Sequence, residues 1–232
     1  MTNRVKLVTV LSLLTALLLG HFTASYSQQR HKVSNLSKKF DLVIDVQTQD
    51  EHRVSGKFSI YRKGAKRPFQ IIRHNETDRR LSEDNPIFVS VSEKQNGKWS
   101  SVYFEDFNFD GNEDLAIADG SNGGYRGTSY RIYLFDRSGR FVFSPSLTRL
   151  AQGPYIGIPE PDRKMRTLEV FWKSGAGFQQ VERYKVIKNR PRKIYEYSKD
   201  SMAGDGNAYI TTKKWVNGRW RVWNKTVKDE NQ

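Results

Sequence analysis

The sequence predicts an all-β protein whose strands form an antiparallel meander. Short runs of alternating or continuous apolar residues recur about every 10 to 15 residues along most of the 232-residue chain. Turn dipeptides that contain glycine separate many of these runs, and Phe, Trp and Tyr make up 12% of the residues, a composition typical of sheets. The spacing fits a propeller, a sandwich or a barrel.

The predicted strands begin at Phe40, where the run Phe40–Thr48 alternates cleanly between apolar and polar residues. Further strands are expected at 56–61, 86–91, 101–107, 114–118, 130–135, 140–144, 167–172, 178–187, 193–197, 208–215 and 219–224. Four turn dipeptides each lie between two such runs and predict hairpins, namely Asn96-Gly97, Ser138-Gly139, Ser174-Gly175 and Asn217-Gly218. We therefore expect one domain over 40–228, after a flexible lead-in at 28–39 and before a short tail at 229–232.

The first 27 residues are typical of a secretory signal peptide. Arg4 and Lys6 precede an apolar run, 7–20, and small residues follow as far as Ser27. The alternative is an uncleaved anchor, although the run is shorter than the roughly 20 residues that span a bilayer. No later segment is apolar enough to cross a membrane, so we expect a periplasmic or secreted protein.

Charge and cysteine content narrow the function classes. The chain has 39 Lys and Arg against 25 Asp and Glu; without Arg4 and Lys6 the mature chain carries 37 − 25 = +12. The absence of cysteine excludes a disulfide scaffold, a cysteine nucleophile, a thiolate metal site and a lipoprotein anchor, and in an exported protein it favours a bacterial periplasm. Because the protein is expected outside the cytoplasm, anionic envelope surfaces are nearer partners for its charge than nucleic acid.

One segment, 106–114, has the spacing of a calcium loop, D-x-N-x-D-G-x-x-D. Calcium takes six to eight oxygen ligands at about 2.3–2.6 Å, so several carboxylate and amide oxygens must converge within a few residues. Asp106, Asn108 and Asp110 at positions one, three and five can point to one side, and Asp114 at position nine adds a carboxylate. Asn112 at position seven can offer its carbonyl oxygen. The sequence therefore predicts structural Ca²⁺ at these five residues.

The loop differs from an EF-hand, because position twelve is Ile117 where a glutamate would be needed. Apolar runs on both sides, Val102–Phe104 and Leu115–Ala118, predict that the ion would hold the turn of a β-hairpin. Magnesium fits less well, since it prefers octahedral geometry and keeps its waters. The simpler alternative is an Asp- and Asn-rich turn without metal.

The segment Val102–Asp119, VYFEDFNFDGNEDLAIAD, resembles a calcium-binding repeat of the FG-GAP/VCBS type. Such repeats form blades of β-propellers, so the resemblance favours a propeller-like fold and implies Asp106, Asn108, Asp110, Asn112 and Asp114 as ligands. The order of segments over about Val102 to Tyr197 is also similar to that of small exported propeller-like proteins of bacteria. Some of these are calcium-dependent lysozyme inhibitors, which serve as periplasmic immunity proteins against peptidoglycan hydrolases.

Two surfaces are candidates for partner binding. Tyr125 and Arg126 lie on a glycine-rich loop after the calcium hairpin, and both residue types are frequent at binding hot spots. The C-terminal region combines Trp215, Trp220 and Trp223 with arginines, although strand alternation predicts at least one of these tryptophans in the core.

The histidines of the mature chain, His31, His52 and His74, lack metal-ligand spacing, and there is no G-x-S-x-G motif, so we expect a protein that is not an enzyme. The sequence thus predicts a calcium-binding protein that inhibits a peptidoglycan hydrolase. The alternative is an envelope binding module for cell-wall glycan or a protein partner, without inhibition.

Overall fold

The computed structural model describes residues 28–48, 53–78, 102–121 and 127–229, which form three antiparallel sheets. In the N-terminal sheet the strands are β1 Gln28–Val33, β2 Phe40–Thr48, β3 Arg53–Arg62 and β4 Gln70–Asp78. In the central sheet they are β5 Val102–Glu105, β6 Asp114–Ser121, β7 Thr128–Phe135 and β8 Phe141–Phe143. In the C-terminal sheet they are β9 Glu160–Asp162, β10 Thr167–Ser174, β11 Phe178–Ile187, β12 Arg190–Asp200, β13 Asn207–Val216 and β14 Arg219–Lys228.

Strands that follow one another in sequence are neighbours in every sheet, which confirms the antiparallel meander. Three of the predicted hairpin turns lie where expected: Ser138-Gly139 joins β7 to β8, Ser174-Gly175 joins β10 to β11, and Asn217-Gly218 joins β13 to β14. Gly139, Gly175 and Gly218 all have positive φ. The predicted strand at 86–91 and the turn at Asn96-Gly97 lie outside the described residues.

The central sheet is buried on both faces, because its strands are apolar at successive positions. Leu115 and Ile117 of β6 pack against the N-terminal sheet, in a core that includes Phe40 and Phe58. Ala116 and Ala118 of the same strand face a second core with residues of the C-terminal sheet, such as Leu168. The short helix α2 Pro145–Thr148 and the 3₁₀ turn η2 Arg149–Ala151 add Leu147 and Leu150 to this second core.

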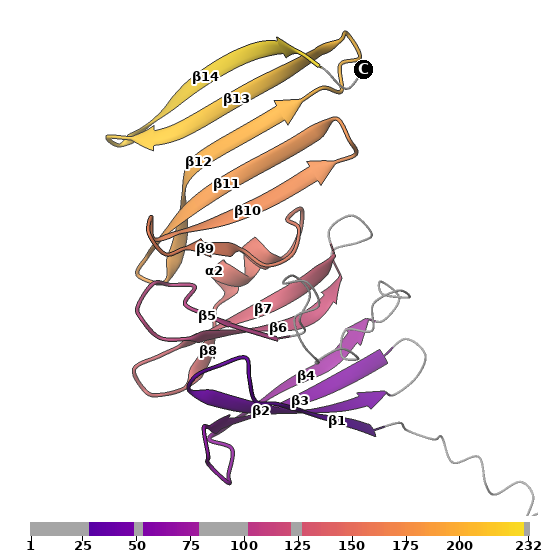
Figure 1. The fold of residues 1–232 in the computed structure, drawn as a ribbon, viewed down its shortest axis with the longest axis vertical. Helices are drawn as coiled ribbons and strands as arrows, with labels where there is room; N and C mark the ends of the chain where they lie inside the picture. Colours follow the sequence, from indigo (N-terminus) through magenta and orange to yellow (C-terminus); the bar gives the residue numbers. More distant parts are fainter. Residues whose placement is uncertain (1–27, 49–52, 79–101, 122–126, 230–232) are drawn as a thin grey trace, which may run out of the picture.

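The three sheets follow one another along the molecule, with the N-terminal sheet at one end of the long axis and β14 at the other (Figure 1). They therefore do not meet in a closed ring within the described part of the chain. The segment 28–33, expected to be a flexible lead-in, is instead an edge strand that pairs with β2 from Gln28↔Gln47 to Val33↔Leu42. Val33 and Leu36 reach the core, which explains why this polar segment is ordered.

The C-terminal sheet extends beyond the second core, so the hairpin of β13 and β14 is largely exposed. Trp215, Trp220 and Trp223 are 41%, 38% and 49% exposed. The expectation that at least one of them lies in the core was wrong, since none of the other sheets formed by the described residues covers either face of this hairpin. Trp215 and Trp220 instead pack against each other edge to face, beside the Asn217-Gly218 turn.

Candidate functional site

The acidic loop 106–113 joins β5 to β6, as the sequence predicts, and its side chains turn inward onto the backbone. Asp106 accepts hydrogen bonds from the N–H groups of Asp110 (3.0 Å) and Gly111 (2.8 Å). The Asn108 Oδ1 atom accepts from the same Asp110 N–H (3.1 Å), and Asp110 accepts from the Asn112 N–H (2.8 Å). Gly111 has φ 89°, the left-handed conformation that this sharp turn requires. Asp106, Asn108 and Asp110 are therefore held close together in one turn.

Asp114 has a different environment from the other predicted ligands. Its side chain is fully buried, and its two oxygens accept hydrogen bonds from the N–H groups of Phe107 and Phe135, each at 2.9 Å. The pKa of Asp114 is raised to about 7, chiefly by burial; the two N–H groups oppose the shift, and the nearby carboxylates of Asp110 and Asp106 add to it. Asp114 thus anchors the loop to β7.

The oxygen atoms of the loop meet some of the requirements of a site for a hard cation such as Ca²⁺. Within the described residues no group of three or more His, Asp or Glu side chains is arranged to hold a metal ion. The loop nevertheless gathers two carboxylates and one amide oxygen, and each carboxylate oxygen that accepts an N–H keeps a second lone pair for a cation. A divalent ion between Asp106 and Asp110 would also offset the negative charge that acts on buried Asp114. Calcium at this loop remains a prediction.

The loop also connects the three sheets. Glu113 accepts hydrogen bonds from the Ser37 hydroxyl (2.8 Å) and the Lys38 N–H (3.3 Å), both in the connection between β1 and β2. On the other side, Asn108 donates to the Asn189 side chain (3.1 Å) in the turn between β11 and β12. The Arg166 guanidinium donates to the Phe109 carbonyl oxygen. An ion that fixed this loop would therefore stabilise contacts to both outer sheets.

Tyr125 and Arg126, the predicted partner contacts, lie outside the described residues. The base of their loop is described, because Ser121 pairs with Thr128 at the ends of β6 and β7. Asp119 holds this base by accepting hydrogen bonds from the Ser129 hydroxyl (2.7 Å), Arg131 Nε (3.0 Å) and Gln152 Nε2 (3.0 Å). The hairpin that carries the predicted contact loop is thus cross-linked at its base.

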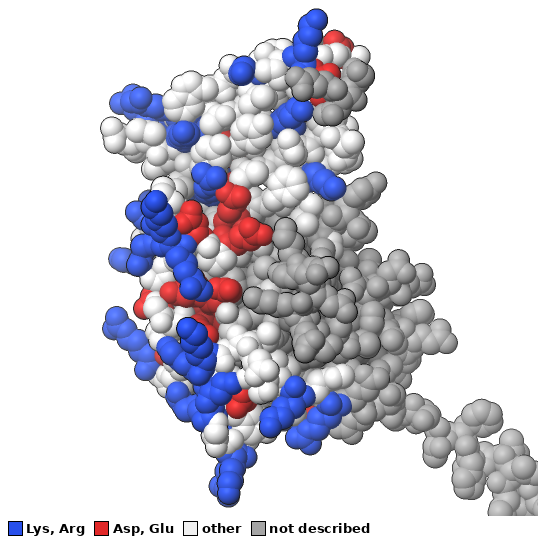
Figure 2. Space-filling view, viewed as in Figure 1, with Lys and Arg blue, Asp and Glu red and all other residues white. Residues whose placement is uncertain are grey.

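A cavity of about 310 Å³ lies beside the acidic loop, between β5 and the segment that leads into β10. Tyr103, Tyr130 and Phe171 form aromatic walls, and Glu105 and Glu160 contribute carboxylates. Arg163 forms an ion pair with Glu105 at 2.9 Å. Acidic side chains gather at the middle of the molecule, in contrast to the basic side chains around them (Figure 2).

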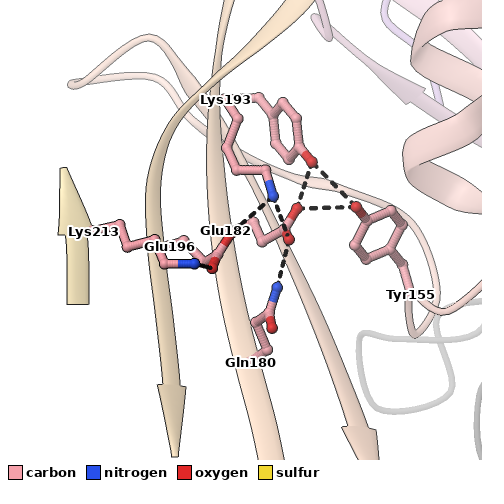
Figure 3. Close-up of polar contacts among 7 residues, drawn as sticks. Tyr155, Gln180, Glu182, Lys193, Glu196 and Lys213 are labelled. Atoms are coloured by element: carbon pink, nitrogen blue, oxygen red, sulfur yellow. Dashed lines mark hydrogen bonds and ion pairs between the residues drawn. The ribbon is translucent and has the colours of Figure 1, made fainter. Parts of the chain in front are cut away.

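A buried carboxylate in the C-terminal sheet was not predicted from the sequence. Glu182 is 3% exposed and accepts hydrogen bonds from Tyr155 (2.9 Å), Gln180, Tyr184 and Lys193 (2.7 Å) (Figure 3). Lys193 continues to Glu196 (2.9 Å), which also pairs with Lys213 (2.7 Å). The only sequence signal is the alternation of Gln180, Glu182 and Tyr184, which places three polar groups on one strand face.

Gln180 and Tyr184 lie on β11 with Glu182, whereas Tyr155 comes from the loop after η2 and Lys193 from β12. The cluster therefore ties β11, β12 and the Tyr155 loop together (Figure 3). The two histidines that the structure describes lie apart from the Glu182 cluster. His74 is buried against Tyr133, with 2.8 Å between Nε2 and the hydroxyl oxygen, and His31 lies on β1, opposite Ile44. His52 lies outside the described residues.

Comparison with known proteins gives a likeness in fold. No family model matches the chain, and no curated protein matches it. Among solved structures, a Xanthomonas type IV secretion system related protein matches with a TM-score of 0.57 and 17% sequence identity. The match covers 85% of this chain and 98% of that protein, so the fold is shared over nearly the whole of the relative. In the described ranges, no helix has the length and apolar character that a membrane crossing needs.

Proposed function

We propose that this chain is an exported calcium-binding β-protein that binds and inhibits a peptidoglycan hydrolase, as a lysozyme inhibitor or periplasmic immunity protein. The observation that carries the proposal is the acidic loop, which gathers Asp106, Asn108 and Asp110 and contacts both outer sheets. The shared fold with a secretion-system related protein supports an envelope setting, as does the signal peptide that the sequence predicts at 1–27.

We expect the hydrolase to be bound by the loop that carries Tyr125 and Arg126, because that loop adjoins two rigid features of the central sheet. Calcium would fix the hairpin of β5 and β6, and Asp119 cross-links the base of the loop that carries Tyr125 and Arg126. A loop held at its base loses less conformational entropy on entering the cleft of a hydrolase. The excess of basic residues favours a target with an acidic or neutral surface over a strongly basic lysozyme.

The proposal is tested by titrating the mature protein against several lysozyme-type hydrolases, with calcium and with EDTA. We expect saturable inhibition that EDTA removes. Replacing Tyr125 and Arg126 together by Ala should weaken inhibition and leave the melting temperature nearly unchanged, because neither residue is expected in the core. Unaltered inhibition in this double variant would eliminate the loop as the contact.

The second candidate function is an envelope binding module without inhibitory activity. The exposed basic and aromatic hairpin of β13 and β14 favours it, since it offers a surface far from the acidic loop. Retention of the protein on purified cell wall in the absence of any hydrolase would support this function.

A further inference from the structure

The C-terminal sheet has an open face whose side chains are ordered in rows. Leu168, Val170, Glu182 and Tyr184 point to the covered face, where they are buried. Residues at the alternate positions of β11 to β14 lie on the opposite face, which we call the outer face. Cross-strand register aligns them in three rows: Arg183, Tyr195, Lys214 and Arg221; Val181, Tyr197, Thr212 and Trp223; Gln179, Lys199, Ile210 and Lys225.

The two flanking rows carry the basic side chains, and the middle row is uncharged and includes Tyr197 and Trp223. Together the three rows hold five Lys or Arg side chains and no Asp or Glu. Rows are about 7 Å apart and adjacent strands about 4.8 Å apart, so the middle row extends roughly 15 Å across four strands. Cations on both sides of this uncharged row form a shallow track that runs across the strands.

Several cations of the outer face are available to a ligand. Arg183 is paired with Glu169 (2.7 Å), and Lys199 lies 3.5 Å from Asp229. Within the described residues no ion pair engages Lys214, Arg221 or Lys225. Arg183 and Lys214 lie over the Tyr195 ring at 4.9 and 5.9 Å, which holds that ring between two positive charges.

We infer that the outer face is a binding surface for an extended carboxylated glycan. Sugar rings would lie on Tyr197 and Trp223 of the middle row, because aromatic faces pack against the apolar faces of sugars. Carboxylates along the glycan would meet Lys214, Arg221 and Lys225 of the flanking rows. This inference rests on the second candidate function, the envelope binding module, whose ligand it specifies, and it does not depend on hydrolase inhibition.

Other occupants fit less well. A second copy of the chain would place the same cations against one another, which is unfavourable. An anionic lipid surface would pair with the cations, but it would give no role to the aromatic side chains that lie between them. On the opposite face β12 carries Glu196 and Asp200, whereas the three rows of the outer face contain no acid.

The test is co-sedimentation of the mature protein with purified peptidoglycan sacculi, with no hydrolase present. We expect saturable binding that weakens with salt and that polygalacturonate competes for, whereas neutral dextran does not. The triple variant Lys214→Glu, Arg221→Glu and Lys225→Glu should weaken binding by about tenfold or more. Trp223→Ala should weaken it by about fivefold.

Trp220→Ala on the same strand is the matched control, because Trp220 lies on the opposite face and is similarly exposed. It should change binding by less than about twofold. An equal loss in both tryptophan variants, failure of polygalacturonate to compete, or stronger binding to phosphatidylglycerol vesicles than to sacculi would overturn the inference. Salt dependence and competition are measured on the wild-type protein, so they hold even if the triple variant fails to fold.

Glycan binding could protect a cell wall from digestion without contact to the enzyme. Hydrolase inhibition is therefore measured on a soluble oligosaccharide substrate in parallel. The triple variant should still inhibit there if both proposals hold, and the Tyr125 and Arg126 double variant should still bind sacculi. Failure of one proposal is thus distinguishable from failure of the other.

Discussion

At the scale of single residues, Asp110 and Asp114 are both aspartates of the predicted calcium site, but only Asp114 is fully buried. Asp110→Ala should remove most of the rise in melting temperature that calcium produces, with a small effect in EDTA. Asp114→Ala should lower the melting temperature in both conditions, because two buried N–H groups lose their acceptor, at a cost of about 1–3 kcal/mol each. Scanning calorimetry of both variants with calcium and with EDTA tests the assignment. Equal behaviour of the two variants would contradict it.

His74 gives the protein a pH-dependent stability. The pKa of His74 is lowered from 6.5 to about 4, chiefly by burial and in part by the charge of Arg131, while Asp119 opposes the shift. The unfolded chain therefore takes up a proton below pH 6.5, whereas the folded protein takes it up only near pH 4. This contribution to stability is fully present above pH 6.5 and is lost as the pH falls toward 4, by about 3 kcal/mol in total.

The measurement is urea unfolding from pH 7 to pH 4 for the wild type and for His74→Gln. Glutamine can still bond the Tyr133 hydroxyl but does not titrate. We expect the difference in unfolding free energy between the two proteins to shrink as the pH falls. A difference that stays constant across this range would show that His74 is not the group responsible.

At the scale of elements, the cluster around Glu182 holds β11, β12 and the Tyr155 loop together. Glu182→Ala would leave Lys193 and two tyrosine hydroxyls without their buried acceptor, and we expect a loss of about 3 kcal/mol in the free energy of unfolding. Glu196→Ala breaks the more exposed pairs with Lys193 and Lys213 and should cost about 1 kcal/mol or less. Chemical denaturation compares the two variants, and equal losses would contradict a dominant role for Glu182.

Much of the strand pattern was predictable from the sequence, because alternation and turn residues are local signals. Phe40–Thr48 is a strand with the predicted bounds, and Asn217-Gly218 makes the last hairpin. The strand at 28–33 was missed because its apolar contacts come from β2 and the core rather than from its own pattern. The Glu182 cluster was missed for a similar reason, since one of its donors, Tyr155, lies 27 residues from Glu182 in the chain.

At the scale of the whole molecule, the acidic loop adds polar contacts to the two hydrophobic cores that already join the central sheet to both outer sheets. The spacing in 106–114 predicted where its side chains converge, but not the contacts of Glu113 with Ser37 or of Asn108 with Asn189. The residues in these two contacts are 76 and 81 positions apart in the chain. Helix and strand periodicity relates only residues that are close in sequence, so it could not predict these contacts.

The link predicts that calcium stabilises more than its own loop. Hydrogen exchange in calcium should be slower than in EDTA at the backbone amides around Ser37 to Phe40 and in the turn at Asn189, as well as at 106–114. The reason is that these segments are held by side chains of the loop. Glu113→Gln is the control, and it should reduce the effect at Ser37 more than at Asn189. Protection confined to 106–114 would show that the loop does not couple the sheets.

The measurement that tests the central claim most directly is hydrolysis of a soluble glycan oligosaccharide by lysozyme-type enzymes in the presence of the mature protein. The account predicts inhibition that saturates at a fixed ratio of protein to enzyme in calcium, that EDTA removes, and that Asp110→Ala weakens. Inhibition that is indifferent to EDTA would contradict the role of the loop. Absence of inhibition for every hydrolase, including any encoded nearby, would contradict the proposed function and leave the envelope binding module in its place.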